Sequence, residues 1–229
     1  MERVRSWRQT TNDFFTDNIV MNICRTILLG LLLAASNAAI GSGVSYELAL
    51  LLKPIQTMSA NFTQQLLDLD GSEVESFQGT FELAKPGKMR WHVKQPMEQQ
   101  LVSDGNILWI YDPDLEQVVI ENFTDKIKST PIALFNGEVA DLDQRYITTM
   151  ESLSSDTELF TLTPKDPESL FSRIDIVFDA SMPKSIGVTD TFDQRTLITF
   201  EELKVNLLLD SSVFSFTIPA QVDVINNVQ

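Results

Sequence analysis

The stretch FELAKPGKMRWHVKQP, Phe81–Pro96, has the pattern of a β-hairpin. Apolar side chains occupy every second position on both sides of Lys85-Pro86-Gly87, a sequence typical of a turn. Successive side chains of a strand point to opposite faces of the sheet, so the alternation predicts one apolar face. The residues on that face are Phe81, Leu83, Met89, Trp91 and Val93. The opposite face is basic and holds Lys88, Arg90, His92 and Lys94.

The same pattern continues on both sides of this hairpin. Alternating runs are separated by turn signals such as Asp70-Gly71-Ser72, Asp104-Gly105-Asn106 and Asp112-Pro113-Asp114. Strands joined by such short turns run antiparallel. The sequence therefore predicts a mainly β protein with strands at 58–69, 74–84, 88–94, 100–103, 107–111, 117–121, 146–150, 158–163, 174–178, 185–191, 197–205 and 213–218.

Three short segments interrupt the strand pattern and are predicted to be helical. The first, VSYELALLLK at 44–53, ends before Pro54, because proline disfavours the helical conformation in the residue that precedes it. The other two, TPIALF at 130–135 and ADLDQR at 140–145, separate two groups of strands. Because no linker or long-period repeat divides the rest of the chain, residues 40–229 are predicted to form one domain.

The apolar face of the predicted sheet is rich in large aromatic and flexible side chains. By the same alternation, it is extended by Met58, Phe62, Phe77, Ile107, Trp109 and Tyr111. Such a face is typical of a packed core, and it also suits the wall of a cavity, because a curled sheet can enclose an apolar ligand. The short helices at 44–53 and 130–135 are apolar enough to cover the mouth of such a cavity. The periodicity leaves both interpretations open.

Residues 27–35, ILLGLLLAA, indicate a secretory signal peptide. Arg25 precedes the apolar run and the small residues SNAAIGSG follow it, as expected around a cleavage site. The alternative is a membrane anchor, but the run is shorter than the roughly 20 residues of a spanning helix. Residues 1–39 are therefore predicted to be a leader and signal peptide. Met21 is an alternative start, because MNICR then supplies a conventional basic n-region.

The composition disfavours several classes of function. The formal net charge is −15, which opposes binding to nucleic acid or to anionic lipid headgroups through net charge. The one cysteine, Cys24, is lost with the signal peptide, so no disulfide, thiol nucleophile or thiolate metal site is expected. His92 is the only histidine, and the sequence has no Gly-x-Ser-x-Gly motif. We therefore expect neither an enzyme nor a bound cofactor.

Five pieces of the sequence, taken in order, carry a resemblance to a known family. They are Phe81–Trp91, LVSDGNILWIYDP at Leu101–Pro113, TPIALF at Thr130–Phe135, LTPKD at Leu162–Asp166 and FTIP at Phe216–Pro219. Together they resemble the periplasmic lipoprotein carriers of the LolA family over essentially all of residues 44–229. The resemblance implies a single curled antiparallel sheet that forms an incomplete, unclosed barrel, with a lid of short helices over an apolar cavity.

Members of this family collect acylated lipoproteins that the LolCDE transporter releases from the inner membrane, and they deliver them to the acceptor LolB at the outer membrane. The resemblance therefore implies a carrier in the periplasm of a Gram-negative bacterium. Its cargo would be acylated lipoproteins, and its partners would be a LolCDE-type transporter and a LolB-type acceptor. We expect it to act as a monomer.

The resemblance also implies roles for particular residues. The cavity wall would comprise Phe62, Phe77, Phe81, Leu83, Met89, Trp91, Ile107 and Trp109. The lid would comprise Leu48, Leu51, Ile132, Leu134 and Phe135. In the family, an arginine just before the hairpin proline holds the lid by hydrogen bonds to its backbone carbonyls, and Lys85 occupies that position here. Because an ammonium group makes several such bonds less readily than a planar guanidinium, we expect a looser lid or a latch formed by Arg90.

Two other classes of function remain open from the sequence. A periplasmic lipid-binding or envelope-sensing module of the same fold would use the same cavity for a free lipid or a signal. A small exported hydrolase would need a polar residue placed for chemistry, and the sequence nominates none.

Overall fold

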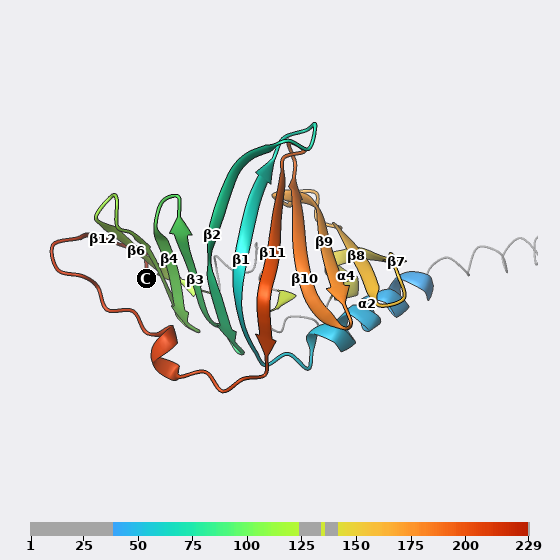
Figure 1. Cartoon of the computed structure of the whole chain (residues 1–229), viewed down its shortest axis with the longest axis horizontal. Coiled ribbons are helices and arrows are strands. Elements are labelled where there is room, and N and C mark those ends of the chain that lie inside the picture. The colour runs from blue at the N-terminus through green and yellow to red at the C-terminus, as the bar shows by residue number, and fades with distance from the viewer. Residues whose placement is uncertain (1–38, 124–133, 136–141, 229) are drawn as a thin grey trace, which may run out of the picture. The chain divides into compact units, whose positions relative to one another are not determined.

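The computed structural model describes residues 39–123, 134–135 and 142–228. The chain divides into two compact units, Met1–Gly43 and Val44–Gln229. Within the second unit, twelve strands form one sheet in the order β12-β6-β5-β4-β3-β2-β1-β11-β10-β9-β8-β7 (Figure 1). Strands that follow one another in the chain lie side by side almost throughout, as the short turns of the sequence predict.

The strands and helices have the following bounds. The strands are β1 (Thr57–Leu67), β2 (Glu73–Ala84), β3 (Lys88–Gln95), β4 (Gln99–Asp104), β5 (Ile107–Asp112), β6 (Gln117–Asn122), β7 (Tyr146–Ser152), β8 (Thr157–Pro164), β9 (Phe171–Asp179), β10 (Met182–Asp190), β11 (Arg195–Val205) and β12 (Asp223–Asn226). The helices are α2 (Ala39–Leu52), α4 (Leu142–Arg145) and the 3₁₀-helix η2 (Ser211–Phe214).

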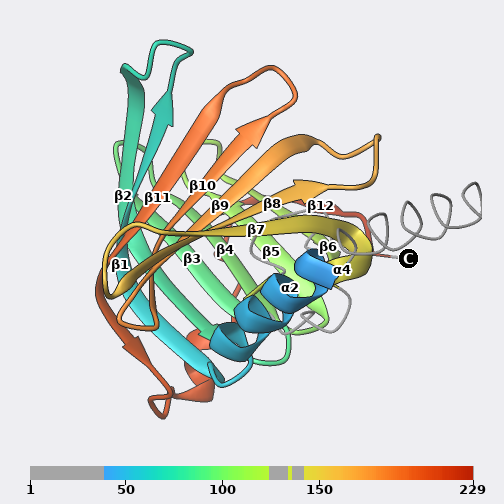
Figure 2. The same ribbon diagram turned by 90° about the vertical axis from the view of Figure 1, so that its right-hand side faces the viewer.

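The sheet curls around a concave face without closing into a barrel, because β12 and β7 stand at opposite ends of the strand order. Figure 2 shows the strands bending around this face, with helix α2 lying across it. The curl follows from the right-handed twist of long neighbouring strands. The predicted fold class, a mainly β protein with one unclosed sheet and few helices, is confirmed, and all strand pairs except β12–β6 are antiparallel as predicted.

The alternation in the β2–β3 hairpin predicts the concave face correctly. Its five alternating apolar residues are all buried in one cluster: Phe81, Leu83, Met89, Trp91 and Val93. The rings of Phe62 in β1 and Trp91 stack with their centroids 3.8 Å apart. Burial of each large apolar side chain contributes about 1.5–3 kcal/mol, so this cluster is a principal source of stability for the hairpin.

The prediction of which side chains of strand β5 point to the concave face is wrong. Leu101 of β4 stands opposite Trp91 on one side and Ile110 of β5 on the other. Residues paired in this way point to the same face, so Leu108 and Ile110, rather than Ile107, Trp109 and Tyr111, face the concave side. The physical reason is that ILWIY is apolar on both faces, so its alternation carries no information about which face is inside.

Residues 206–222, which we call the C-terminal segment, connect β11 to β12. This segment covers the convex face of β4–β6, which explains why that face is also apolar. The Phe216 ring lies 6.3 Å from the Trp109 ring and 5.7 Å from the Tyr111 ring, between centroids. Three buried side chains do not belong to the concave cluster: Val102 and Val118 of the sheet and Phe214 of the C-terminal segment. The molecule therefore has a second, smaller apolar cluster on its outer side.

The prediction of a strand at 213–218 is also wrong. Asp210 caps η2 through a hydrogen bond from the Ser212 amide, and an irregular segment then leads to β12. Strand β12 pairs with β6 in parallel, in contrast to the antiparallel pairing predicted throughout. It can do so because a long connection, instead of a tight turn, brings it to the sheet edge.

Candidate functional site

The concave face and the helix across it gather most of the residues that the sequence nominates. Five predicted wall residues belong to one buried cluster: Phe62, Phe81, Leu83, Met89 and Trp91. The same cluster contains Leu48 of α2 and the predicted lid residues Leu134 and Phe135. Phe77 and Leu51 are partly buried against it. Ile132 lies outside the described residues, and Ile107 and Trp109 lie on the convex face.

This cluster packs the apolar side of α2 against flexible and aromatic side chains of the sheet. Helix α2 presents Leu48 and Leu52 to the sheet, while the sheet presents aromatic rings and Met89. Methionine is flexible and polarisable, and aromatic rings offer large apolar surfaces, so such a wall can repack around ligands of different shape. The contacts that α2 makes in this structure are therefore ones that an apolar ligand could replace.

Lys85 fastens the C-terminal end of α2. Its Nζ atom donates a hydrogen bond of 2.9 Å to the carbonyl oxygen of Leu52, the last residue of the helix. The last carbonyls of a helix lack partners within the helix and carry partial negative charge, so a cation is favourable there. Burial lowers the pKa of the Lys85 ammonium group. The residue nominated as the latch thus contacts one of the two segments nominated as the lid.

A pair of buried hydroxyl groups holds α2 to the sheet at Ser45, nearer the start of the helix. Ser45 Oγ donates to Thr148 Oγ1 of strand β7 at 3.0 Å, and both residues are buried. A buried hydroxyl without a partner is costly, so the two groups satisfy one another in apolar surroundings. This contact was not predicted from the sequence. Its only signal there is that Ser45 lies three and seven residues before Leu48 and Leu52, on the apolar side of the helix.

Arg90 does not act on the lid, and this part of the prediction is wrong. Its guanidinium donates to the Val213 carbonyl at 3.2 Å and to Gln100 Oε1 at 2.6 Å, both on the convex side. The reason is strand alternation, which points Arg90 away from the concave face. Beside it, burial raises the pKa of the Glu82 carboxyl, although the charges of Arg90, Lys94 and His92 oppose that shift.

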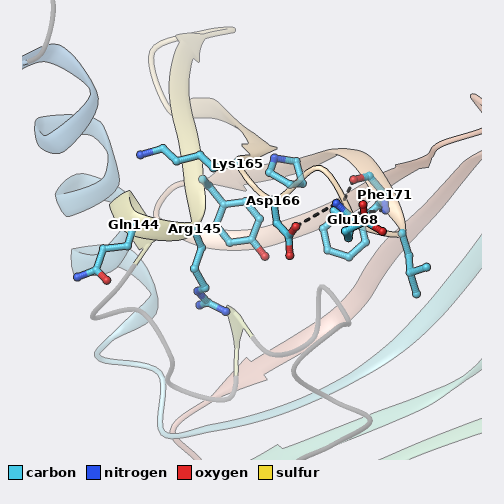
Figure 3. Close-up of a pocket in the computed structure, with 10 residues that line it drawn as sticks. Gln144, Arg145, Lys165, Asp166, Glu168 and Phe171 are labelled. Carbon is cyan, nitrogen blue, oxygen red and sulfur yellow. Dashed lines mark hydrogen bonds between the residues drawn. The ribbon is translucent and has the colours of Figure 1, made fainter.

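A separate hollow of about 450 Å³ lies between α4 and the β8–β9 turn (Figure 3). Arg145 and Lys165 both line it, but Figure 3 shows their side chains pointing in different directions. The Asp166 carboxylate accepts the Glu168 amide at 3.0 Å and stabilises the turn itself. The two cationic groups therefore do not converge on one ligand position.

Other kinds of site are not seen in the part of the chain that the structure describes. No group of three or more His, Cys, Asp or Glu side chains there is arranged to hold a metal ion. Over the same residues, no helix has the length and apolar character needed to cross a membrane. The concave face is therefore the strongest candidate site among the described residues.

Comparison with known proteins identifies the family of the chain. The family model of the outer membrane lipoprotein carrier protein LolA matches residues 53–217. An outer-membrane lipoprotein carrier protein from Chromohalobacter salexigens is 38% identical over 184 residues, which are 80% of this chain and 87% of that protein. One from Hahella chejuensis is 35% identical over 206 residues, covering 90% of this chain and 98% of that protein.

Among solved structures, an uncharacterised conserved protein from Thermus thermophilus has the same fold. The TM-score is 0.53 and the sequences are 11% identical, with 80% of this chain and 99% of that chain covered. At that identity the likeness concerns the fold alone. The match to the family model and the identity to its members decide the matter, and the chain belongs to the LolA family of outer-membrane lipoprotein carrier proteins.

Proposed function

We propose that this chain binds the acyl chains of lipoproteins against its concave face and carries them across the periplasm. The observation that supports this most is the apolar cluster beneath a helix that polar side chains hold through Lys85 to Leu52 and Ser45 to Thr148. Relatives with one third or more identical residues are named outer-membrane lipoprotein carrier proteins. The role needs no catalytic group.

The energetics of acyl chains explain why such a carrier is needed. Each methylene group buried from water is worth about 0.8 kcal/mol, so a 16-carbon chain costs on the order of 10 kcal/mol to leave exposed. A lipoprotein with several chains cannot cross an aqueous space unaided at that cost. When acyl chains take the place of α2 against the concave apolar wall, most of this cost is removed.

Release of the cargo requires that binding be no tighter than necessary. When the carrier is empty, α2 covers the wall, so a ligand must first displace these contacts. The free energy of that displacement lowers the apparent affinity for acyl chains. An acceptor with a more open apolar site can then take the cargo without an energy source.

The remaining parts of the proposal concern location and partners. With residues 1–39 removed as a signal peptide, the domain 40–229 would work as a monomer in the periplasm. It would load at a LolCDE-type transporter of the inner membrane and unload at a LolB-type acceptor of the outer membrane. A free-lipid carrier of the same fold would need neither partner, which gives the two proposals different experimental outcomes.

The test uses spheroplasts that synthesise a radiolabelled outer-membrane lipoprotein. Purified residues 40–229 are added, and the labelled lipoprotein in the supernatant is counted against buffer and against serum albumin, which binds free lipid. We expect a soluble complex of one carrier per lipoprotein, followed by transfer to isolated outer membranes. Release no greater than that with albumin, alongside tight binding of free fatty acid, would favour the free-lipid carrier.

A further inference from the structure

Five turns of the sheet share one edge and form a surface that we call the rim. They are residues 68–72, 96–98, 113–116, 165–170 and 191–194, which join β1–β2, β3–β4, β5–β6, β8–β9 and β10–β11. In the strand order these pairs follow one another, so successive turns are neighbours along this edge. The 68–72 turn projects beyond the 96–98 turn, because β3 ends at Gln95, opposite Gln78 of β2. Figure 1 shows these turns along the upper side of the sheet.

Every turn of the rim exposes one large apolar side chain. The exposed fractions are 74% for Leu69, 57% for Met97, 68% for Leu115, 71% for Leu170 and 84% for Phe192. At the opposite edge, the hairpin turns 85–87, 105–106, 153–156 and 180–181 expose only Leu153, at 52%, and the chain that leaves β11 exposes Leu207 and Leu208, at 46% and 101%. A single exposed apolar residue is ordinary, but a row of them along one edge marks an interaction surface.

Hydrogen bonds fix the backbone at these apolar residues before any partner arrives. An aspartate side chain accepts the amide of Leu69 at 2.7 Å, of Leu115 at 3.1 Å and of Phe192 at 2.7 Å. The acceptors are Asp68, Asp112 and Asp190. Because these three turns are already ordered, little free energy is lost in ordering them when a partner binds.

The rim is also strongly acidic. With the flanking Asp112 and Asp190, its turns contain ten acidic residues and one basic residue, Lys165. That is a net charge of −9 out of −15 for the whole chain. Such a field attracts a basic surface and is repelled by the anionic headgroups of a membrane.

We propose that the rim docks on a basic, apolar surface of a partner protein at the inner membrane. Each exposed side chain would enter a shallow apolar site, and lysine or arginine side chains around it would face the carboxylates. The identification of the partner as a loading component rests on the proposed function. The rim lies on turns and shares no residue with the buried cluster of the concave face, so docking leaves the wall residues free for cargo.

The test measures binding of fluorescently labelled residues 40–229 to spheroplasts, apart from any release of lipoprotein. We compare the parent protein with the double variant Leu69→Ser/Phe192→Ser, and with Leu153→Ser as a matched control at the opposite edge. We expect saturable binding that weakens at least tenfold in the double variant and changes less than twofold in the control. Trypsin treatment of the spheroplasts should abolish it, and high salt should weaken it.

Several outcomes would overturn the proposal. Binding of the double variant at the parental strength would show that the rim plays no part. Binding that survives trypsin, or that vesicles of phosphatidylethanolamine and phosphatidylglycerol reproduce, would show a lipid surface instead. The proposed function has its own readout in the same samples. If the parent binds through the rim and releases no lipoprotein, docking stands and lipoprotein carriage does not.

Discussion

At the scale of single residues, we propose that Lys85 controls how firmly the helix lies on the concave face. A hydrogen bond from a charged donor to a carbonyl contributes about 1.5–3 kcal/mol when buried, and less here because Lys85 is about half buried. We expect Lys85→Leu to speed binding of an apolar fluorescent probe about fivefold or more in stopped-flow measurements. It should alter lipoprotein release more than it alters the free energy of unfolding.

The matched control is Lys94→Leu, which removes the same charge from an exposed position in β3. If both variants bound the probe at the parental rate, Lys85 would not restrain the helix. The departure from arginine to lysine at this position would then have no consequence for opening.

Glu82 makes stability depend on pH in an unusual direction. Burial raises its folded-state pKa above the unfolded value, so the folded protein binds the proton more tightly. The contribution to the free energy of unfolding is therefore fully present below the unfolded pKa and declines as pH rises through the folded pKa. In the described residues, Glu82 Oε2 is buried and has no hydrogen-bond partner.

We expect Glu82→Gln to remove this decline and to raise the free energy of unfolding at pH 7 relative to the parent. Urea unfolding at pH 4 to 8 measures both proteins. Parallel pH profiles for the two would show that the carboxyl is not the source of the effect.

At the scale of elements, α2 and β7 are coupled through two hydroxyl groups. We expect Ser45→Ala and Thr148→Val each to destabilise the packed position of the helix by leaving the partner hydroxyl buried and unpaired. The double variant should then lose less than the sum of the single losses, with a coupling of about 1 kcal/mol. Probe-binding rates and urea unfolding of the four proteins in the cycle measure it, and strictly additive losses would contradict the contact.

The C-terminal segment is a second element whose packing can be measured. Phe216 contacts Trp109 and Tyr111 on the convex face, so Phe216→Ala should lower the free energy of unfolding by about 1–3 kcal/mol, less than for a fully buried ring. Ile218→Ala, two residues later and more exposed, serves as control. Equal losses for both variants would mean that the segment is held by its backbone and not by this ring.

At the scale of the whole molecule, the sequence predicts which face of the sheet a side chain points to only where apolar and polar residues alternate. Phe81 and Trp91 are separated by charged and polar residues, so their facing could be read directly. Trp109 could not be placed, because its strand is apolar on both sides and only the C-terminal segment explains why. The Ser45–Thr148 contact joins residues 103 positions apart, and no local pattern encodes such a pairing.

The molecule has a concave apolar face covered by helix α2 and a convex apolar patch on β4–β6 covered by its own C-terminal segment. We therefore expect the cargo to contact one of these faces and not the other. Acyl chains should contact the concave cluster, where α2 can yield, and should not reach the convex cluster beneath the C-terminal segment.

The most direct measurement is photo-crosslinking of a lipoprotein whose acyl chains carry tritium. A photoreactive phenylalanine derivative replaces Trp91 in one protein and Trp109 in another, and each is loaded at spheroplasts and irradiated. We predict that tritium is attached at position 91 and not at position 109. Labelling at 109 that equals or exceeds labelling at 91, in complexes formed to the same extent, would contradict carriage on the concave face.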